Sequence, residues 1–368
     1  MPAPVIVPQP LADARAAFVG GAGYLAACTQ GLPLRATLSA SQAELDAWER
    51  GEATPAAYGA AVEEARAAFS SIVGVPADRV AIGSQVSAIA ATVAASLPDG
   101  AEVVCVDGDF SSMVFPFLAQ QHRGVTVVHA PLDRLADAIG PRTRLVAFSL
   151  VQSATGAVAD ADAIIAAAAT HGAITFADLT QAVGWLPVDA SRFDLTACHA
   201  YKWLCAPRGS AFLTVGDRML DELRPVQAGW FAGDDPWASC YGPDMHLARD
   251  ARRFDVSPAW PVWPGTAAAL AFFAGLDQNA VHAYTSGLGD ALCDRLGLPA
   301  LGQAIVTWPD ADGSDLAALT ASGIRASGRA GRARVAFHLW NSTDDIARAG
   351  DALPAKDRGS AGPGPSGS

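Results

Sequence analysis

The sequence predicts an α/β protein in which helices cover both faces of a mostly parallel sheet, followed by a smaller α+β domain. Short apolar or β-branched runs alternate with Ala-rich helical segments from about residue 80 to 215, as in strands joined by crossover helices. Runs such as Glu102–Val106 are apolar almost throughout, which is typical of strands buried on both faces. After about residue 245 a Trp/Pro-rich connector, helices and a late strand, Ala333–Leu339, indicate the second domain.

The strands of the large domain are predicted, in chain order, at Val80–Ile82, Glu102–Val106, Val125–His129, Leu145–Leu150, Ala173–Ala177, Leu195–His199 and Ala211–Val215. Helices are predicted at Ser87–Ser96, Met113–Gln121, Leu132–Ile139 and Ala159–Thr170, after an amphipathic helix over Ala56–Val73. The domains predicted from this pattern are an N-terminal arm (1–15), a large domain (16–245), a small C-terminal domain (246–355) and a disordered tail (356–368).

Composition and charge narrow the class of protein. The 368 residues are 51% hydrophobic and 17% charged, as in globular domains, and the formal net charge is −12. That charge argues against a nucleic-acid partner, because phosphate binding needs clustered Lys and Arg. No apolar run reaches membrane-helix length, no signal-peptide pattern opens the chain, and the six cysteines form no metal-binding or disulfide pattern. A cytoplasmic protein with reduced thiols and no metal site is expected.

Lysine is scarce, and this scarcity makes each lysine informative. The chain has only Lys202 and Lys356, although arginine is abundant. Arginine replaces lysine wherever any cation serves, but it cannot form an imine. Lys356 lies in a Gly/Ser/Pro-rich terminal stretch, whereas Lys202 has aromatic and apolar neighbours in HAYKWLCAPRG. Lys202 is therefore the candidate for covalent chemistry.

Polar residues follow several predicted strands at their carboxyl ends, where open α/β sheets bind ligands. Gly83-Ser84-Gln85 precede a helix whose N-terminus would bind phosphate, although an ordinary helix cap is equally compatible. Phe110 follows the second strand, where it could stack on a flat ring or simply pack at the rim. Ser153 follows the fourth strand at the mouth of the same region.

Asp178 ends the fifth strand, and a buried carboxylate is costly without a partner. A protonated pyridine nitrogen is such a partner, while capping of the next helix is the structural alternative. Gln181 follows within one turn, and Lys202 comes 24 positions after Asp178. This ordered set is much more specific than any of its members.

The stretch over residues 177–215 resembles the signature region of the class V aminotransferase family of pyridoxal 5′-phosphate (PLP) enzymes, which includes cysteine desulfurases and kynureninases. The family pattern is roughly D-x-x-Q/H-x-x-G…D…K…GP-x-G. Three further stretches are similar to the family's motifs in the same order: YLAACTQGLP, WPGTAAALAFFAGL and RARVAFHLWNSTDDI. The resemblance implies the PLP fold type I, with a seven-stranded sheet in the large domain, and a homodimer.

Carried over by position, the resemblance makes Lys202 the Schiff-base lysine and Asp178 the partner of the pyridine nitrogen. Gln181 would bind the phenolic oxygen of the cofactor. Phe110 stands where the family usually has a ring-stacking His, and it cannot transfer a proton. Ser153 replaces an Asn that usually contacts the ring.

The resemblance also assigns the cofactor phosphate. Ser84 and Gln85 would bind it through the helix N-terminus, and His199 and Tyr201 would reach it from beside the lysine. Thr266 would reach the phosphate of the opposite subunit. The Trp-rich segment before Thr266 is expected to be buried against that subunit.

Arg334 matches the arginine that clamps the α-carboxylate of an amino-acid substrate in the family. The alternative is a surface ion pair with Asp344 or Asp345.

The reaction expected from the resemblance proceeds through an external aldimine with an amino acid. No cysteine occurs in SGIRASGRAGRARV, where desulfurases carry their mobile cysteine, so a persulfide-type desulfurase is not expected. Transamination is the first prediction. A C–S lyase of the ergothioneine-forming sulfoxide type and a kynureninase-like hydrolase are the alternatives, and epimerisation is also left open. A non-catalytic binding protein is the alternative of another class.

Overall fold

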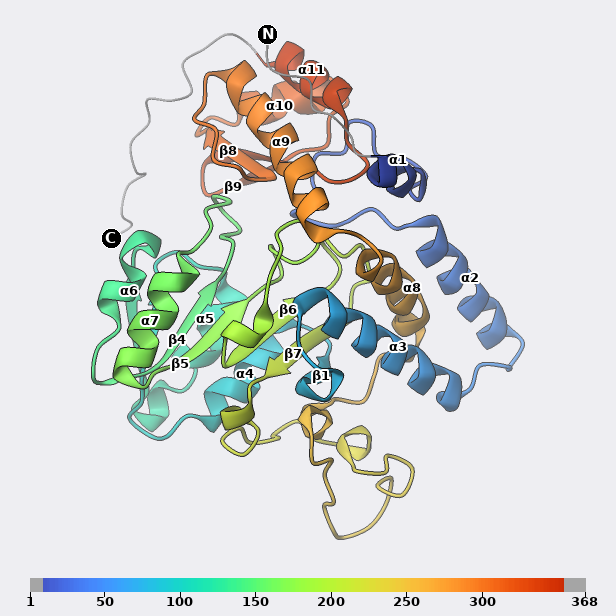
Figure 1. Cartoon of the computed structure of the whole chain (residues 1–368), viewed down its shortest axis with the longest axis vertical. Coiled ribbons are helices and arrows are strands. Elements are labelled where there is room, and N and C mark those ends of the chain that lie inside the picture. Colours follow the sequence, from blue (N-terminus) through green and yellow to red (C-terminus); the bar gives the residue numbers. More distant parts are fainter. Residues whose placement is uncertain (1–8, 354–368) are drawn as a thin grey trace.

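A seven-stranded sheet forms the centre of the large domain in the computed structural model, which describes residues 9–353 (Figure 1). Its strands are β1 (Val80–Gly83), β2 (Glu102–Val106), β3 (Thr126–Ala130), β4 (Thr143–Ser149), β5 (Ile174–Asp178), β6 (Leu195–His199) and β7 (Ala211–Val215). Their spatial order is β1-β7-β6-β5-β4-β2-β3, and only β7 runs antiparallel to its neighbours. The predicted fold class is confirmed.

Helices cover both faces of this sheet because alternate strand residues point to opposite sides. In β2, Val103 packs into one core together with residues of α4 and α5, while Val104 packs into the other together with α3 and α7. The helices of the large domain are α2 (Arg35–Glu49), α3 (Pro55–Val73), α4 (Val86–Ser96), α5 (Ser111–Leu118), α6 (Leu135–Ala138), α7 (Ala161–His171) and α8 (Trp263–Ala274). Local signals set their ends: α3 follows the capping hydroxyl of Thr54 and stops at Gly74, which has a positive φ.

A three-stranded antiparallel sheet, in the order β8-β10-β9, forms the small domain. Its elements are α9 (Gln278–Leu296), β8 (Ile305–Pro309), α10 (Ser314–Ala321), β9 (Ser327–Arg329), β10 (Arg332–Ala336) and α11 (Thr343–Ala352). The late strand begins one residue before the predicted Ala333–Leu339 and ends at Ala336, three residues early, although Phe337 N still donates to Ala304 O in the same register. The segment after α1 (Gln9–Ala16) joins this domain, since Leu25 N donates to Arg325 O and Ala336 N to Leu25 O.

The segment between β7 and α8 is fixed to the large domain by a buried ion pair. Arg66 Nη2 of α3 lies 2.8 Å from Asp255 Oδ2, and Asp255 also accepts from the backbone N–H of Ile82 in β1. The predicted boundary at 245/246 stays a prediction; α8, which follows it, packs along α3. Lys356 and the predicted tail over 356–368 lie outside the described residues, as do residues 1–8 of the predicted arm.

The Trp-rich segment corrects one expectation. Trp263 is buried within its own chain and meets Phe212 edge-on, and Trp260 stacks on Tyr58 at 5.2 Å between ring centroids. These tryptophans therefore find their partners in their own subunit, and their presence is no argument for a dimer.

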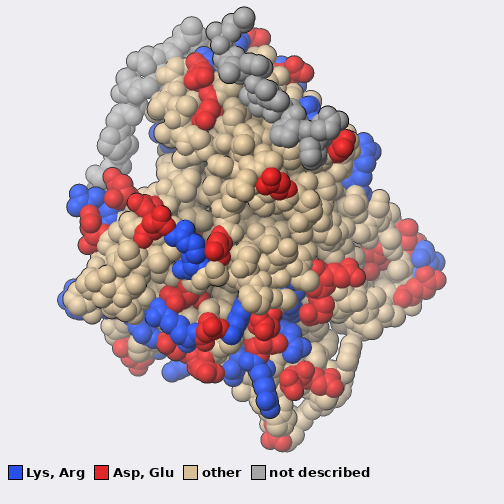
Figure 2. Space-filling view, viewed as in Figure 1, with Lys and Arg blue, Asp and Glu red and all other residues tan. Residues whose placement is uncertain are grey.

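Acidic and basic side chains are interspersed on the face drawn in Figure 2, without a continuous basic area. Among residues 9–353, no helix combines the length and the apolar character that crossing a membrane would require.

Candidate active site

The two residues that carried the sequence argument lie together at the carboxyl edge of the sheet. Asp178 is the last residue of β5, and Lys202 follows β6 in a tight turn. Both are buried, with 5% and 7% of their surfaces exposed. Asp178 Oδ1 accepts from Thr180 N at 2.9 Å, but no ion pair joins Asp178 to Lys202 among the described residues.

Burial shifts both of these groups towards neutrality. Desolvation raises the pKa of Asp178 to about 6, against the hydrogen bonds from Thr180 and the charge of Lys202, which lower it. Desolvation lowers the pKa of Lys202 to about 8, although the Asp178 carboxylate acts in the opposite direction. A lysine with this pKa has a substantial neutral fraction near neutral pH, which imine formation requires.

A cavity opens over these two groups. The sequence predicted eight of its lining residues: Gln85, Phe110, Ser153, Asp178, Gln181, His199, Tyr201 and Lys202. Six further lining residues were missed: Val86, Ser87, Ser112, Ser149, Thr180 and Arg208. Three predicted site residues, Ser84, Thr266 and Arg334, do not line it.

The end of the cavity at α4 differs slightly from the prediction. Gln85 is the N-cap residue of α4, so the backbone N–H groups of the first turn belong to Val86 and Ser87, which line the cavity. Ser84 is exposed and lies outside the lining. Thr266 is fully buried, and its hydroxyl oxygen lies 2.9 Å from Ser210 Oγ. The assignment of Thr266 to an opposite subunit stays a prediction.

His199 and Tyr201 flank the lysine turn with their rings edge to face, 4.4 Å between centroids. Desolvation and the nearby Arg208 guanidinium lower the pKa of His199 to about 4, so its imidazole is neutral at physiological pH. Arg208 Cζ lies 5.0 Å from the centroid of the Tyr201 ring. This side of the cavity therefore offers a guanidinium, a phenol and a neutral imidazole beside the α4 N-terminus.

An aromatic ring faces the lysine. Lys202 Nζ lies 5.7 Å from the centroid of the Phe110 ring, and Phe110 is 47% exposed at the cavity rim. Gln181 Nε2 donates to Ser153 Oγ at 3.2 Å, and Gln181 Oε1 accepts from Trp203 Nε1. These bonds fix the Gln181 amide at the cavity wall.

Arg334 is not on the surface, as one alternative had it. It is 1% exposed, and its guanidinium donates to Ser153 Oγ, Ser327 Oγ and Thr29 Oγ1 at 3.1–3.2 Å. Asp345 instead caps α11. The surface pair with Asp344 or Asp345 is therefore wrong, and Arg334 lies directly behind Ser153 of the cavity wall.

Residues of the N-terminal segment complete this corner, and the sequence argument missed them. Cys28 O accepts from Gln181 Nε2 at 2.9 Å, and the buried Cys28 thiol is close enough to Arg334 and Lys202 to influence the pKa of each. The motif YLAACTQGLP placed this segment in the family pattern. It did not indicate which residues of the site the segment contacts.

The cavity fits the group that the family resemblance implies. Asp178 is a buried carboxylate without an ion-pair partner among the described residues, which suits a protonated pyridine nitrogen. The Phe110 ring stands over the lysine amine at a stacking position, and the α4 N-terminus offers backbone donors to a phosphate. Lys202, Asp178, Gln181 and the first turn of α4 would hold PLP.

A helix-covered, mostly parallel sheet with a buried lysine one strand beyond a buried aspartate defines a PLP enzyme of fold type I. Residues 45–324 match the family model "Aminotransferase class-V". The chain belongs to this family, and pyridoxal phosphate is its cofactor.

Curated relatives span several reactions. An isopenicillin N epimerase of Streptomyces clavuligerus is 30% identical over 338 residues, which cover 79% of this chain and 83% of that protein. A kynureninase of Deinococcus radiodurans is 30% identical, with 77% and 73% covered.

Solved structures share the fold at lower identity. The cysteine desulfurase CsdA of Escherichia coli has a TM-score of 0.80 at 20% identity and covers 93% of this chain and 97% of that one. A complex of the cystine C-S lyase C-DES with its product cysteine persulfide has a TM-score of 0.79 at 23% identity, covering 90% and 98%. Because these structural neighbours include a cysteine desulfurase, they do not support the expectation that this chain is not a persulfide-type desulfurase.

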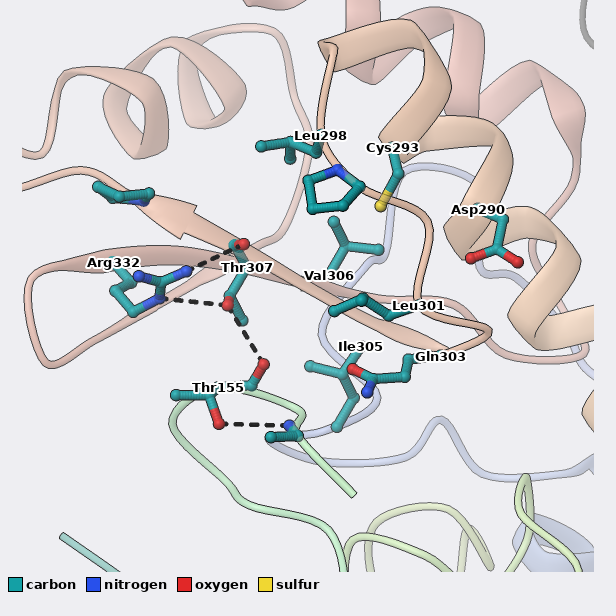
Figure 3. A pocket seen from close by; sticks show the side chains of 13 residues that line it. Thr155, Asp290, Cys293, Leu298, Leu301, Gln303, Ile305, Val306, Thr307 and Arg332 are labelled. Atoms are coloured by element: carbon teal, nitrogen blue, oxygen red, sulfur yellow. Dashed lines mark hydrogen bonds between the residues drawn. The ribbon is translucent and has the colours of Figure 1, made fainter. Parts of the chain in front are cut away.

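A second cavity, of about 290 Å³, lies between the small domain and the loop around Thr155 (Figure 3). Apolar side chains such as Leu298, Leu301 and Ile305 line most of it, and Arg332 points to Thr307 at its edge. Its lining residues include no lysine, so they offer no amine for an imine.

Proposed function

We propose that this chain carries its cofactor on Lys202 and transfers the amino group of an α-amino acid. The observation that carries the proposal is the buried Lys202 facing Asp178 beneath the Phe110 ring. Bound PLP withdraws electrons from the substrate's α-carbon and so makes its α-proton acidic.

Each residue of the chain has a defined part in this proposal. Asp178 holds its negative charge at the far end of the ring. Arg334 binds and orients the α-carboxylate after exchanging its hydroxyl partners for it. The free amine of Lys202 is the base that removes the proton from the substrate's α-carbon. The same amine then donates this proton, from the same side of the substrate.

Transamination is favoured over epimerisation by the residue opposite the lysine. Inversion at the α-carbon by two bases needs a proton donor on each face. Phe110 occupies the second face near the lysine, and a phenyl ring cannot donate a proton. Transfer of the α-proton on one face needs only Lys202.

A C–S lyase or persulfide reaction is the second candidate, and the Cys28 thiol is the observation that favours it. This thiol lies near both Lys202 and Arg334. Relatives named as probable cysteine desulfurases, such as that of Methanothermobacter thermautotrophicus, point the same way. Sulfide that is released from cysteine in the presence of a thiol reductant, and that is lost in Cys28→Ser, would favour this candidate. Kynureninase-like hydrolysis would instead release anthranilate from kynurenine.

We also propose a homodimer located in the cytoplasm. The segment between β7 and α8 extends away from the rest of the molecule at the bottom of Figure 1. It exposes Trp237, Tyr241 and Met245 at 58%, 95% and 73%, which favours burial against a second copy. An enzyme that turns over as a monomer in sedimentation would contradict the dimer.

The test uses the two lysines as a matched pair. Lys202→Arg should lose the visible band of the covalently held cofactor and all turnover, while Lys356→Arg keeps both. Borohydride reduction followed by peptide mapping should place the cofactor on Lys202. A band that survives in Lys202→Arg would overturn the assignment, and a chain that never binds PLP would point to the non-catalytic alternative. Assays for oxo acid, sulfide, alanine and inverted amino acid then identify the reaction.

A further inference from the structure

Three arginines of the small domain share one face of its sheet. Arg332 and Arg334 are two positions apart on β10, so their side chains lie on the same face. Arg329 pairs with Arg332 across the β9–β10 ladder, and Ser327 pairs with Arg334. Arg334 donates to Ser327 Oγ on this face and to Ser153 Oγ of the active-site wall, so the Arg334 end of the face lies next to the active site.

Arg329 and Arg334 have no carboxylate partner. Neither forms an ion pair with an acid of the described part of the chain. Arg329 instead donates to the backbone O of Gly328 at 2.7 Å. The positive charge of Arg329 acts on the site. It lowers the pKa of Arg334, where desolvation and the Cys28 thiol are larger influences, and it also lowers the pKa of Lys202.

Two guanidinium groups placed this close repel each other unless an anion lies between them. Diagonal neighbours on paired antiparallel strands are about 7–8 Å apart, and both side chains are long. Arg334 is buried behind Ser153, whereas Arg329 is exposed at the outer side of the same face. An α-carboxylate held by Arg334 therefore leaves Arg329 free for a group further out on the same substrate.

We propose that the substrate is an amino acid whose side chain carries a second anionic group, and that Arg329 binds that group. This inference rests on the proposed function, because it takes Arg334 as the α-carboxylate site. The substrate class would be a dicarboxylic amino acid or an amino acid with an isosteric side-chain sulfinate. Arg329 is a specificity residue in this proposal and does not touch the reacting atoms.

The test compares acid and amide pairs of equal shape. Glutamate with glutamine, and aspartate with asparagine, are titrated into the PLP-loaded enzyme, and the dissociation constant is read from the change in the cofactor's absorbance. The enzyme should bind the acid of at least one pair at least about tenfold more tightly, as expected for a charged hydrogen bond. Arg329→Ala should remove most of that preference and leave the amide's constant within about twofold.

Arg332→Ala is the matched control, since Arg332 is the cross-strand neighbour of Arg329 but points to Thr307 and the second cavity (Figure 3). It should keep the preference, and Arg334→Ala should weaken acid and amide alike. Retention of the cofactor band in each variant reports that the site is intact. Equal binding of acid and amide by the unaltered enzyme, or an unchanged preference in Arg329→Ala, would overturn the inference. Absence of any Lys202-linked band in the unaltered enzyme would instead refute the proposed function.

Discussion

Two buried pairs of opposite charge occupy different regions of the large domain, and they differ in one respect. At the base of α3, Arg66 and Asp255 are 2% and 1% exposed and form a direct ion pair at 2.8 Å. At the carboxyl edge of the sheet, Asp178 and Lys202 are nearly as buried but form no ion pair among the described residues. The first pair is satisfied within the chain, and the second leaves both of its members available to a third group. Burial of charge is therefore common to both regions, and the missing contact distinguishes the proposed active site.

Replacing the acid of each pair should give the sharpest contrast. Asp178→Asn should cut turnover by orders of magnitude, because the neutral amide cannot keep the pyridine nitrogen protonated, while the cofactor stays attached to Lys202. The matched variant Asp255→Asn should leave turnover per bound cofactor unchanged. Steady-state rates normalised to cofactor content test both, and near-normal turnover in Asp178→Asn would remove this residue from the reaction.

Stability should respond in the opposite way. Asp255→Ala leaves the buried Arg66 with only Glu63 and the backbone O of Val80, and it also leaves the N–H of Ile82 without its acceptor. We expect a loss of about 3 kcal/mol in the free energy of unfolding, the lower end of the range for a broken buried pair. Denaturant unfolding measures this loss.

Replacing both members of that pair provides its control. Arg66→Met combined with Asp255→Leu should recover much of the loss, because an apolar pair leaves no buried charge. A cost for Asp255→Ala below 1 kcal/mol would mean that water reaches Arg66 and that this pair is not the closed contact described.

The smallest expected effect is a shift in pH dependence. Only the neutral amine of Lys202 attacks the cofactor aldehyde, so its rate of attachment to cofactor-free enzyme should rise about tenfold per pH unit and level off above a pH of about 8. The Asp178 carboxylate raises the pKa of Lys202, so Asp178→Asn should move the midpoint to lower pH. Stopped-flow absorbance measures this rate, and a midpoint that moves to higher pH would contradict the electrostatic coupling.

Much of the fold and the centre of the site could be predicted because their signals are local. Apolar runs bounded by turns identify the strands. Asp178 ends β5 and Lys202 follows β6, at the edge where open α/β sheets bind ligands. At the α4 end, Ser84 and Gln85 were predicted, whereas Gln85, Val86 and Ser87 line the cavity, because the sequence does not mark whether Gln85 caps α4 or belongs to it. Val86 and Ser87 were missed because a helix N-terminus offers its backbone N–H groups, which no side chain in the sequence identifies.

The Arg334 corner could not be predicted because it joins three distant segments. Thr29, Ser153 and Arg334 meet only in the folded chain, with 305 positions between Thr29 and Arg334. The tryptophans misled for a similar reason, since the partner of Trp260 is Tyr58, on a helix about 200 positions earlier. Side-chain chemistry identified which residues were unusual, and only tertiary contacts identified their partners.

Gly31 lies against the lysine turn: its N–H donates to Tyr201 O, and a Cβ there would stand 2.0 Å from Lys202 O. The same segment is tied to β10 through Leu25 and Ala336. On the ribosome, residues 24–31 therefore emerge long before the strand that fixes them. Lys202 precedes Arg334 of that strand by 132 positions (334 − 202), which take about 7–26 s to synthesise at about 5–20 residues per second. For that interval we expect Lys202 to lack its N-terminal cover, so that pyridoxal phosphate has open access to the nascent chain.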